Sequence, residues 1–126
     1  MKHQQIRLEC GPGVARRLVD LLRDYTEVAF PAHSTDCAQV AREAMLDAIA
    51  SLESSLLAEG RAEYSKRLRA MFREAVKMHF ELHAAETGEC CEARTAALHA
   101  LCGGEALADA DYAAAETRDR AAGHKA

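Results

Sequence analysis

The chain has 126 residues, of which 49% are apolar and 29% are charged, so its size and composition are those of a single globular domain. It holds 27 alanines but only three phenylalanines, three tyrosines and no tryptophan, which favours helices over a β-sandwich or barrel. The formal net charge of -4 argues against a dedicated DNA-binding protein, so nucleic acid is not an expected partner.

The sequence shows no membrane-spanning run and no N-terminal signal peptide, as expected for a cytoplasmic protein. No apolar run is long enough to span a membrane, and charges return early in the N-terminal segment, at Arg7 and Glu9, which excludes a signal peptide there. Five cysteines, an odd number that includes the adjacent pair Cys90 and Cys91, are typical of free thiols in a reducing compartment. We therefore expect a cytoplasmic protein, and the alanine- and arginine-rich composition suggests a bacterial source.

The N-terminal part is expected to be an extended arm, residues 1–12, followed by a helix. Ile6 and Leu8 alternate with charged side chains as in a strand, but no second strand is predicted elsewhere to pair with them. The first helix is predicted over residues 14–30, because apolar side chains recur there at steps of three and four, and Pro31 ends it.

Two long helices are predicted next, from Asp36 to Glu59 and over residues 64–87. Ser34, Thr35 and Asp36 are all good N-caps, Asp36 with Gln39 resembles a capping box, and Gly60 is the expected left-handed residue after the second helix. Joined through Gly60, the two helices are expected to form a long antiparallel hairpin. The predicted buried seam of the third helix comprises Tyr64, Leu68, Met71, Ala75, Met78, Leu82 and Ala85, and a second stripe beside it comprises Phe72, Val76, His79 and His83.

A short fourth helix, predicted from Glu89 to Cys102, completes an all-α bundle of four main helices in one domain, residues 1–104. Residues 105–126 are alanine-rich and offer few large apolar side chains, so they are predicted to form a partly frayed C-terminal tail helix. The hairpin carries more apolar surface than the short fourth helix can cover, and we therefore expect a homodimer.

Candidate metal ligands cluster between residues 79 and 102. His79 and His83 are four residues apart, so their imidazoles share one face of a helix. On the fourth helix His99 and Cys102 are three residues apart, and Cys91 is expected to face inward. Imidazole and thiolate together favour zinc, copper or nickel. The alternative is purely structural, with the cysteines buried as small apolar side chains and the histidines half-buried or solvated.

Linear motifs of enzymes are absent from the sequence, which has no Gly-x-Ser-x-Gly, no P-loop and no dinucleotide-binding fingerprint. No histidine has a glutamate three residues before it, which excludes a ferritin-like di-iron site. The sequence therefore favours a regulatory or adaptor protein that acts through protein–protein contacts over an enzyme. The alternative function is a metal-binding bundle that senses, stores or carries zinc, copper or nickel.

Overall fold

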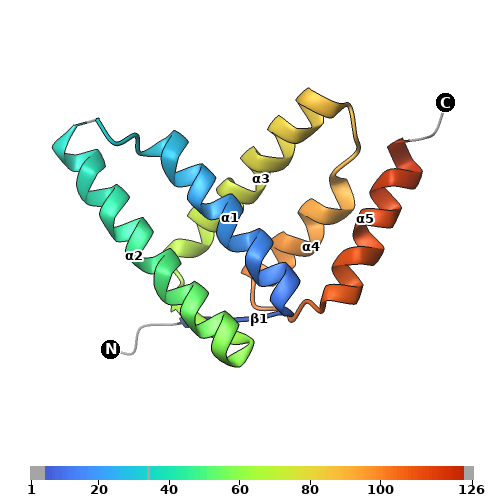
Figure 1. Cartoon of the computed structure of the whole chain (residues 1–126), viewed down its shortest axis with the longest axis horizontal. Coiled ribbons are helices and arrows are strands. Elements are labelled where there is room, and N and C mark those ends of the chain that lie inside the picture. Colours follow the sequence, from blue (N-terminus) through green and yellow to red (C-terminus); the bar gives the residue numbers. More distant parts are fainter. Residues whose placement is uncertain (1–4, 34, 124–126) are drawn as a thin grey trace.

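The computed structural model describes residues 5–33 and 35–123, and that part of the chain is mostly helical (Figure 1). The predicted all-α class is confirmed in broad terms, with a fifth helix and a small sheet in addition. None of the described helices combines the length and apolar character needed to cross a membrane. The elements in chain order are β1 (Gln5–Glu9), α1 (Pro12–Ala29), α2 (Asp36–Glu59), β2 (Arg61–Ser65), α3 (Leu68–Thr87), α4 (Glu92–Cys102) and α5 (Asp109–Gly123).

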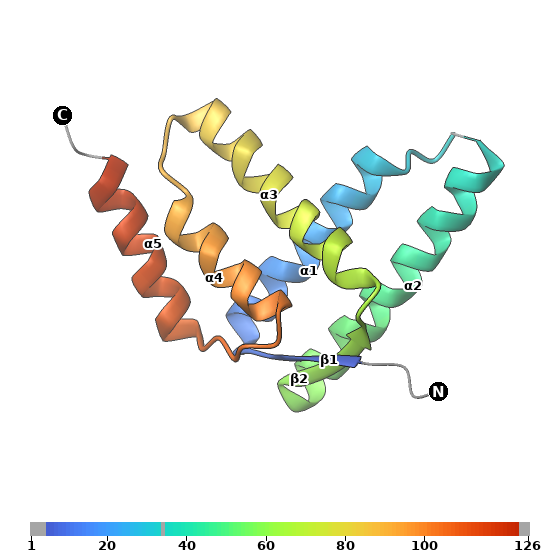
Figure 2. The ribbon, with the colours of Figure 1, turned by 180° about the vertical axis from the view of Figure 1, so that it is seen from behind.

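Helix α1 is the centre of the molecule. It contacts α2 along one side and α3 along the other, and α4 then packs against both α3 and α5 (Figures 1 and 2). Pro12 begins the helix, where its fixed φ angle and missing N–H cost nothing. Its buried face comprises Val14, Ala15, Leu18, Val19, Leu21, Leu22 and Thr26, with the three- and four-residue spacing of a helix packed between two neighbours.

The predicted arm is a strand, and the prediction that it has no partner is wrong. Strand β1 pairs antiparallel with β2, so that Ile6 lies opposite Tyr64 and Leu8 lies opposite Ala62. Buried Ala62 and Tyr64 alternate with exposed residues, which is the period-two pattern of a half-buried strand. The five residues of β2 were too short a segment to separate from the helix that follows. Residues 1–4 of the predicted arm lie outside the described residues.

The predicted hairpin of the second and third helices is also wrong. Gly60 does end α2 in the left-handed region, at φ 73°, but the chain then enters β2, and α1 lies between α2 and α3. The buried face of α3 lies between the two predicted stripes: Ala75 of the seam is buried, as are Phe72 and Val76 of the stripe beside it. Leu82 of the seam is 52% exposed. A dimer, which was expected from the hairpin, stays a prediction. The buried residues of α3 are Phe72, Ala75, Val76 and Phe80.

Helix α5 is part of the packed structure, in place of the loosely docked tail that the sequence suggested. It buries Tyr112, Ala115 and Asp119 against the rest of the chain. At its first turn the Asp109 carboxylate accepts hydrogen bonds from the backbone N–H groups of Gly13, at 3.1 Å, and Val14, at 2.9 Å. The carboxylate thereby caps the N-terminus of α1. Residues 124–126 of the predicted tail lie outside the described residues.

Candidate functional site

A groove lies between the C-terminal halves of α1 and α3. The two helices cross near their middles and diverge toward their C-terminal ends, which both views show (Figures 1 and 2). The space between them has a volume of about 170 Å³. We call it the α1–α3 groove, and its lining residues are Leu21, Asp24, Tyr25, Val28, Met78, His79, Leu82, His83 and Glu86.

The apolar lining of the groove follows directly from helical spacing. On α1, Leu21, Tyr25 and Val28 are separated by four and three residues and form one wall, and on α3 Met78 and Leu82 form the other. Leu21 is buried, whereas Val28 is 61% exposed and Leu82 is 52% exposed. Because the helices diverge, the apolar side chains near their C-terminal ends are too far apart to bury each other, and Val28 and Leu82 stay exposed.

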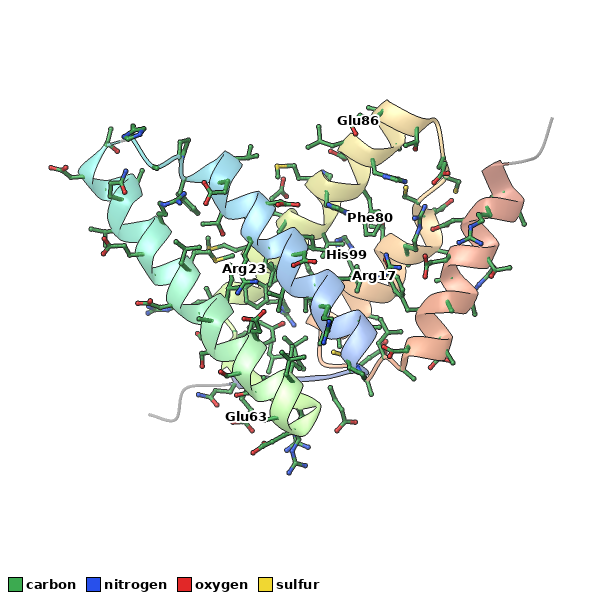
Figure 3. The ribbon with its side chains drawn as sticks, viewed as in Figure 1. Arg17, Arg23, Glu63, Phe80, Glu86 and His99 are labelled. Carbon is green, nitrogen blue, oxygen red and sulfur yellow. The ribbon has the colours of Figure 1, made fainter. Side chains whose placement is uncertain are left out.

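A second depression, of about 240 Å³, adjoins the groove on the side of α4 and α5. It shares Leu21, Asp24, His79 and His83 with the groove, so the two form one continuous surface. Its further lining is mostly polar or aromatic. Figure 3 shows Glu86 near the C-terminal end of α3, and Arg17 on the part of α1 nearer to α5. We call this depression the polar cleft, and its additional residues are Arg17, Asp20, Phe80, Arg94 and Tyr112.

The two predicted imidazole ligands of α3 lie in the wall of the groove, but they have different surroundings. Burial lowers the pKa of His79, and the opposing effect of nearby Asp24 is smaller. His83 lies further along α3, where its Nε2 is 3.0 Å from a carboxylate oxygen of Glu89. The hydrogen bond from His83 lowers the pKa of Glu89. The groove wall therefore holds one half-buried imidazole and one that pairs with a surface carboxylate.

The remaining predicted ligands lie away from the groove lining. His99 is 3.1 Å, through Nε2, from the backbone carbonyl of Arg73. Cys102 is fully buried, and burial raises the pKa of its thiol to about 12. The Cys91 sulfur accepts a hydrogen bond from Arg94 at 3.3 Å. Within residues 5–33 and 35–123, no three His, Cys, Asp or Glu side chains are grouped so that they could hold one metal ion.

One cluster beside the polar cleft was missed by the sequence analysis. Asp119 of α5 is 2% exposed and accepts backbone hydrogen bonds from Ala93 at 2.7 Å and Arg94 at 3.1 Å, so it caps α4. It also binds the Arg94 side chain at 2.7 Å. Burial by itself would raise the pKa of Asp119, but these hydrogen bonds outweigh it and lower the pKa. The Arg94 guanidinium lies 5.4 Å from the centre of the Phe80 ring.

Comparison of the chain with protein-family models, with curated proteins and with solved structures finds no match in any of the three. What the site can bind is therefore inferred from the side chains that line it. The described residues that line the groove include no Ser, Thr, Cys or Lys. What the groove offers is exposed apolar surface with ionisable groups at its edges, which is suited to binding.

Proposed function

We propose that the protein is a binding protein of the adaptor or regulatory kind, and that its α1–α3 groove receives an apolar helical segment of a partner protein. The observation that carries this proposal is the position of Val28 and Leu82. They lie on opposite walls of one groove, although each is more than half exposed. The other exposed large apolar side chains of the described chain, Val40 and Leu57, lie on α2 outside the groove. Single exposed apolar residues are ordinary, whereas a facing pair over an apolar floor is typical of an interaction site.

The size of the groove favours a polypeptide partner over a free small molecule. Pockets that bury drug-sized ligands hold about 300–1,000 Å³. The α1–α3 groove, which is the apolar part of this surface, has about 170 Å³ and is by itself smaller than that range. A space of this size fits individual side chains, and a partner helix can place its residues i, i+3 or i+4, and i+7 along a groove between two helices.

The metal-binding alternative stays a prediction of the sequence. His79 and His83 share the groove wall, but within the described chain the third ligand that a protein metal site ordinarily needs is not grouped with them. We therefore assign these imidazoles to the lining of the binding surface, where each can donate or accept a hydrogen bond.

Site-specific photo-crosslinking in the cells that produce the protein tests the proposal. A photoreactive phenylalanine analogue would replace Val28 or Leu82 in the groove, and Val40 or Leu57 as matched exposed positions on α2. We expect one discrete partner to be crosslinked from both groove positions and from neither α2 position. The purified partner should then lose affinity for a variant that carries Val28→Gln and Leu82→Gln. Crosslinks of equal yield from the groove and from α2 would contradict the proposal.

A further inference from the structure

Acidic side chains flank the apolar part of the α1–α3 groove on both walls. Asp24 lies on α1 beside Tyr25, and Glu86 lies one turn beyond Leu82 on α3 (Figure 3). Neither carboxylate makes a hydrogen bond or an ion pair with any other residue that the structure describes. The groove therefore presents two carboxylates that the described chain does not neutralise.

Two arginines where α1 faces α2 are paired with carboxylates there. Arg23, the neighbour of Asp24 in sequence, binds Glu53 of α2 through two hydrogen bonds, of 3.2 and 2.9 Å. Arg42 of α2 likewise makes a bidentate ion pair with Glu27, through hydrogen bonds of 3.0 and 2.7 Å. Both ion pairs join α1 to α2, so these cations are directed away from the groove.

The two imidazoles of the groove wall have different partners: His83 lies 3.0 Å from Glu89, and His79 is half-buried. Burial lowers the pKa of His79 below its ordinary value of 6.5, so this side chain is mainly uncharged at pH 7. The cations of the polar cleft, a depression that Asp24 also lines, have partners on α5. Arg94 binds Asp119, and Arg17 lies 3.6 Å from Glu116. Of the two carboxylates, Glu86 lines the groove alone, whereas Asp24 also lines the polar cleft, whose arginines are paired on α5.

From this arrangement we infer that the occupant of the groove is a basic amphipathic helix of a partner protein, with Lys or Arg residues flanking its apolar stripe. This inference rests on the proposed function and adds the charge of the partner to it. Cations on the partner helix would meet Asp24 and Glu86 while its apolar residues contact Val28 and Leu82. An acidic helix would bring like charges together at the same places, which opposes binding.

The test compares two synthetic amphipathic peptides of about 18 residues, five helical turns, one built from leucine and lysine and the other from leucine and glutamate. Binding of the fluorescein-labelled peptides to the full chain is measured by fluorescence anisotropy. We expect the Leu/Lys peptide to bind more tightly, and its affinity to fall as salt rises, because exposed charge pairs are screened beyond about 8 Å at 0.15 M salt.

A pair of charge variants separates a local effect from the overall acidity of the protein. Asp24→Asn with Glu86→Gln should weaken binding of the Leu/Lys peptide by about two- to tenfold, the effect of two exposed charge pairs. The matched control is Glu43→Gln with Asp47→Asn, which removes the same two charges from exposed positions on α2. The control should bind as the unchanged protein does. Equal losses in both variants would overturn the inference.

A pair of apolar variants separates this inference from the proposed function. Val28→Gln with Leu82→Gln should abolish binding of the peptide, whereas Val40→Gln with Leu57→Gln should not. If the Leu/Glu peptide binds as well as the Leu/Lys peptide and depends on Val28 and Leu82, the charge inference fails and the proposed function stands. If neither peptide depends on those two residues, both fail. Self-association that disappears in the Val28 and Leu82 variant would show a second copy in the groove, and would also overturn the inference.

Discussion

Helices α2 and α5 flank the central helices from opposite sides (Figure 1), and they are held in place in different ways. Helix α2 packs on α1 through a stripe of buried apolar side chains, and the ion pairs that join the two helices are exposed. Helix α5 buries few large apolar side chains, and two of its carboxylates cap other helices. The stripe of α2 comprises Met45, Ile49, Leu52 and Leu56.

The difference shows which kind of anchoring can be recognised along a sequence. An apolar stripe is a local pattern, and its period identifies both the helix and its buried face. A carboxylate cap on another helix joins residues that are far apart in the chain, 95 residues for Asp109 and Val14 and 26 for Asp119 and Ala93. Asp119 therefore looks like any other surface charge of an alanine-rich helix until the fold is known.

The largest effect is expected for a change in the apolar stripe of α2. Leu52 is 3% exposed, and Leu52→Ala should lower the free energy of unfolding by about 2–5 kcal/mol, because it removes buried methyl groups and leaves a cavity. Leu57→Ala is the matched control in the same helix, since Leu57 is 50% exposed. Urea denaturation followed by circular dichroism measures both. Equal losses would contradict the assignment of the buried face.

A comparable loss of unfolding free energy is expected when one carboxylate of α5 is replaced by an amide. Asp119→Asn removes the charge that pairs with the largely buried Arg94 side chain and should cost about 2–4 kcal/mol. Asp111→Asn, at an exposed position of the same helix, is the control and should be close to neutral. A neutral Asp119→Asn would mean that α5 is anchored by its apolar contacts alone.

The pH dependence should distinguish the two helices further. The folded chain holds the pKa of Asp119 below its ordinary value of 3.8, so the carboxylate stabilises the fold above that pH. This contribution is lost as pH falls through the lower folded pKa. The difference in unfolding free energy between the unchanged protein and Asp119→Asn should therefore shrink below about pH 4, whereas the effect of Leu52→Ala should not. Denaturation curves over a pH series measure both trends.

The second cap of α5 should contribute less. Asp109 is exposed and binds two backbone N–H groups at the start of α1. Asp109→Ala should cost about 1 kcal/mol, the usual effect of losing an N-cap. Gly11 approaches this carboxylate so closely that a Cβ there would lie 2.4 Å from an Asp109 oxygen. Gly11→Ala should therefore disturb the same cap. Amide hydrogen exchange measures the effect, and the first turn of α1 should lose more protection than α2. A larger loss of protection in α2 would contradict this.

The smallest effect is expected at the exposed ion pairs of α2. Glu53→Gln breaks the pair with Arg23, in which both side chains are more than one third exposed, and should change stability only slightly. High salt should reduce even this difference. A loss as large as that of Asp119→Asn would show that charge anchors both helices alike.

Much of the helical framework was predictable, because it follows local patterns. The ends of α2 were largely predictable, since Thr35 is one of the three candidate cap residues at its start and Gly60 follows its last residue. The placement of α3 was only partly predictable. Its two adjacent apolar stripes are equally regular, and only the crossing with α1 decides that Phe72 is buried while Leu82 is exposed. The pairing of β1 with β2 was hidden for a similar reason, because it joins segments more than fifty residues apart.

Only two of the five predicted ligands, His79 and His83, line the candidate site. The spacing of His79 and His83 correctly placed both imidazoles on one face of α3. That this face borders Val28 and Tyr25 of α1 depends on the angle at which the two helices diverge, which no local pattern encodes. The sequence therefore predicted that the imidazoles bind a metal, whereas in the structure they share the groove with apolar side chains and carboxylates.

The most direct test of the binding surface is an amide chemical-shift map of the ¹⁵N-labelled protein during titration with the Leu/Lys peptide. The account predicts that the shifts concentrate on both walls of the α1–α3 groove, around Tyr25, Val28, Met78 and Leu82, and leave Val40 on α2 unchanged. Shifts spread over α2 and α5, or absent from either wall of the groove, would contradict it.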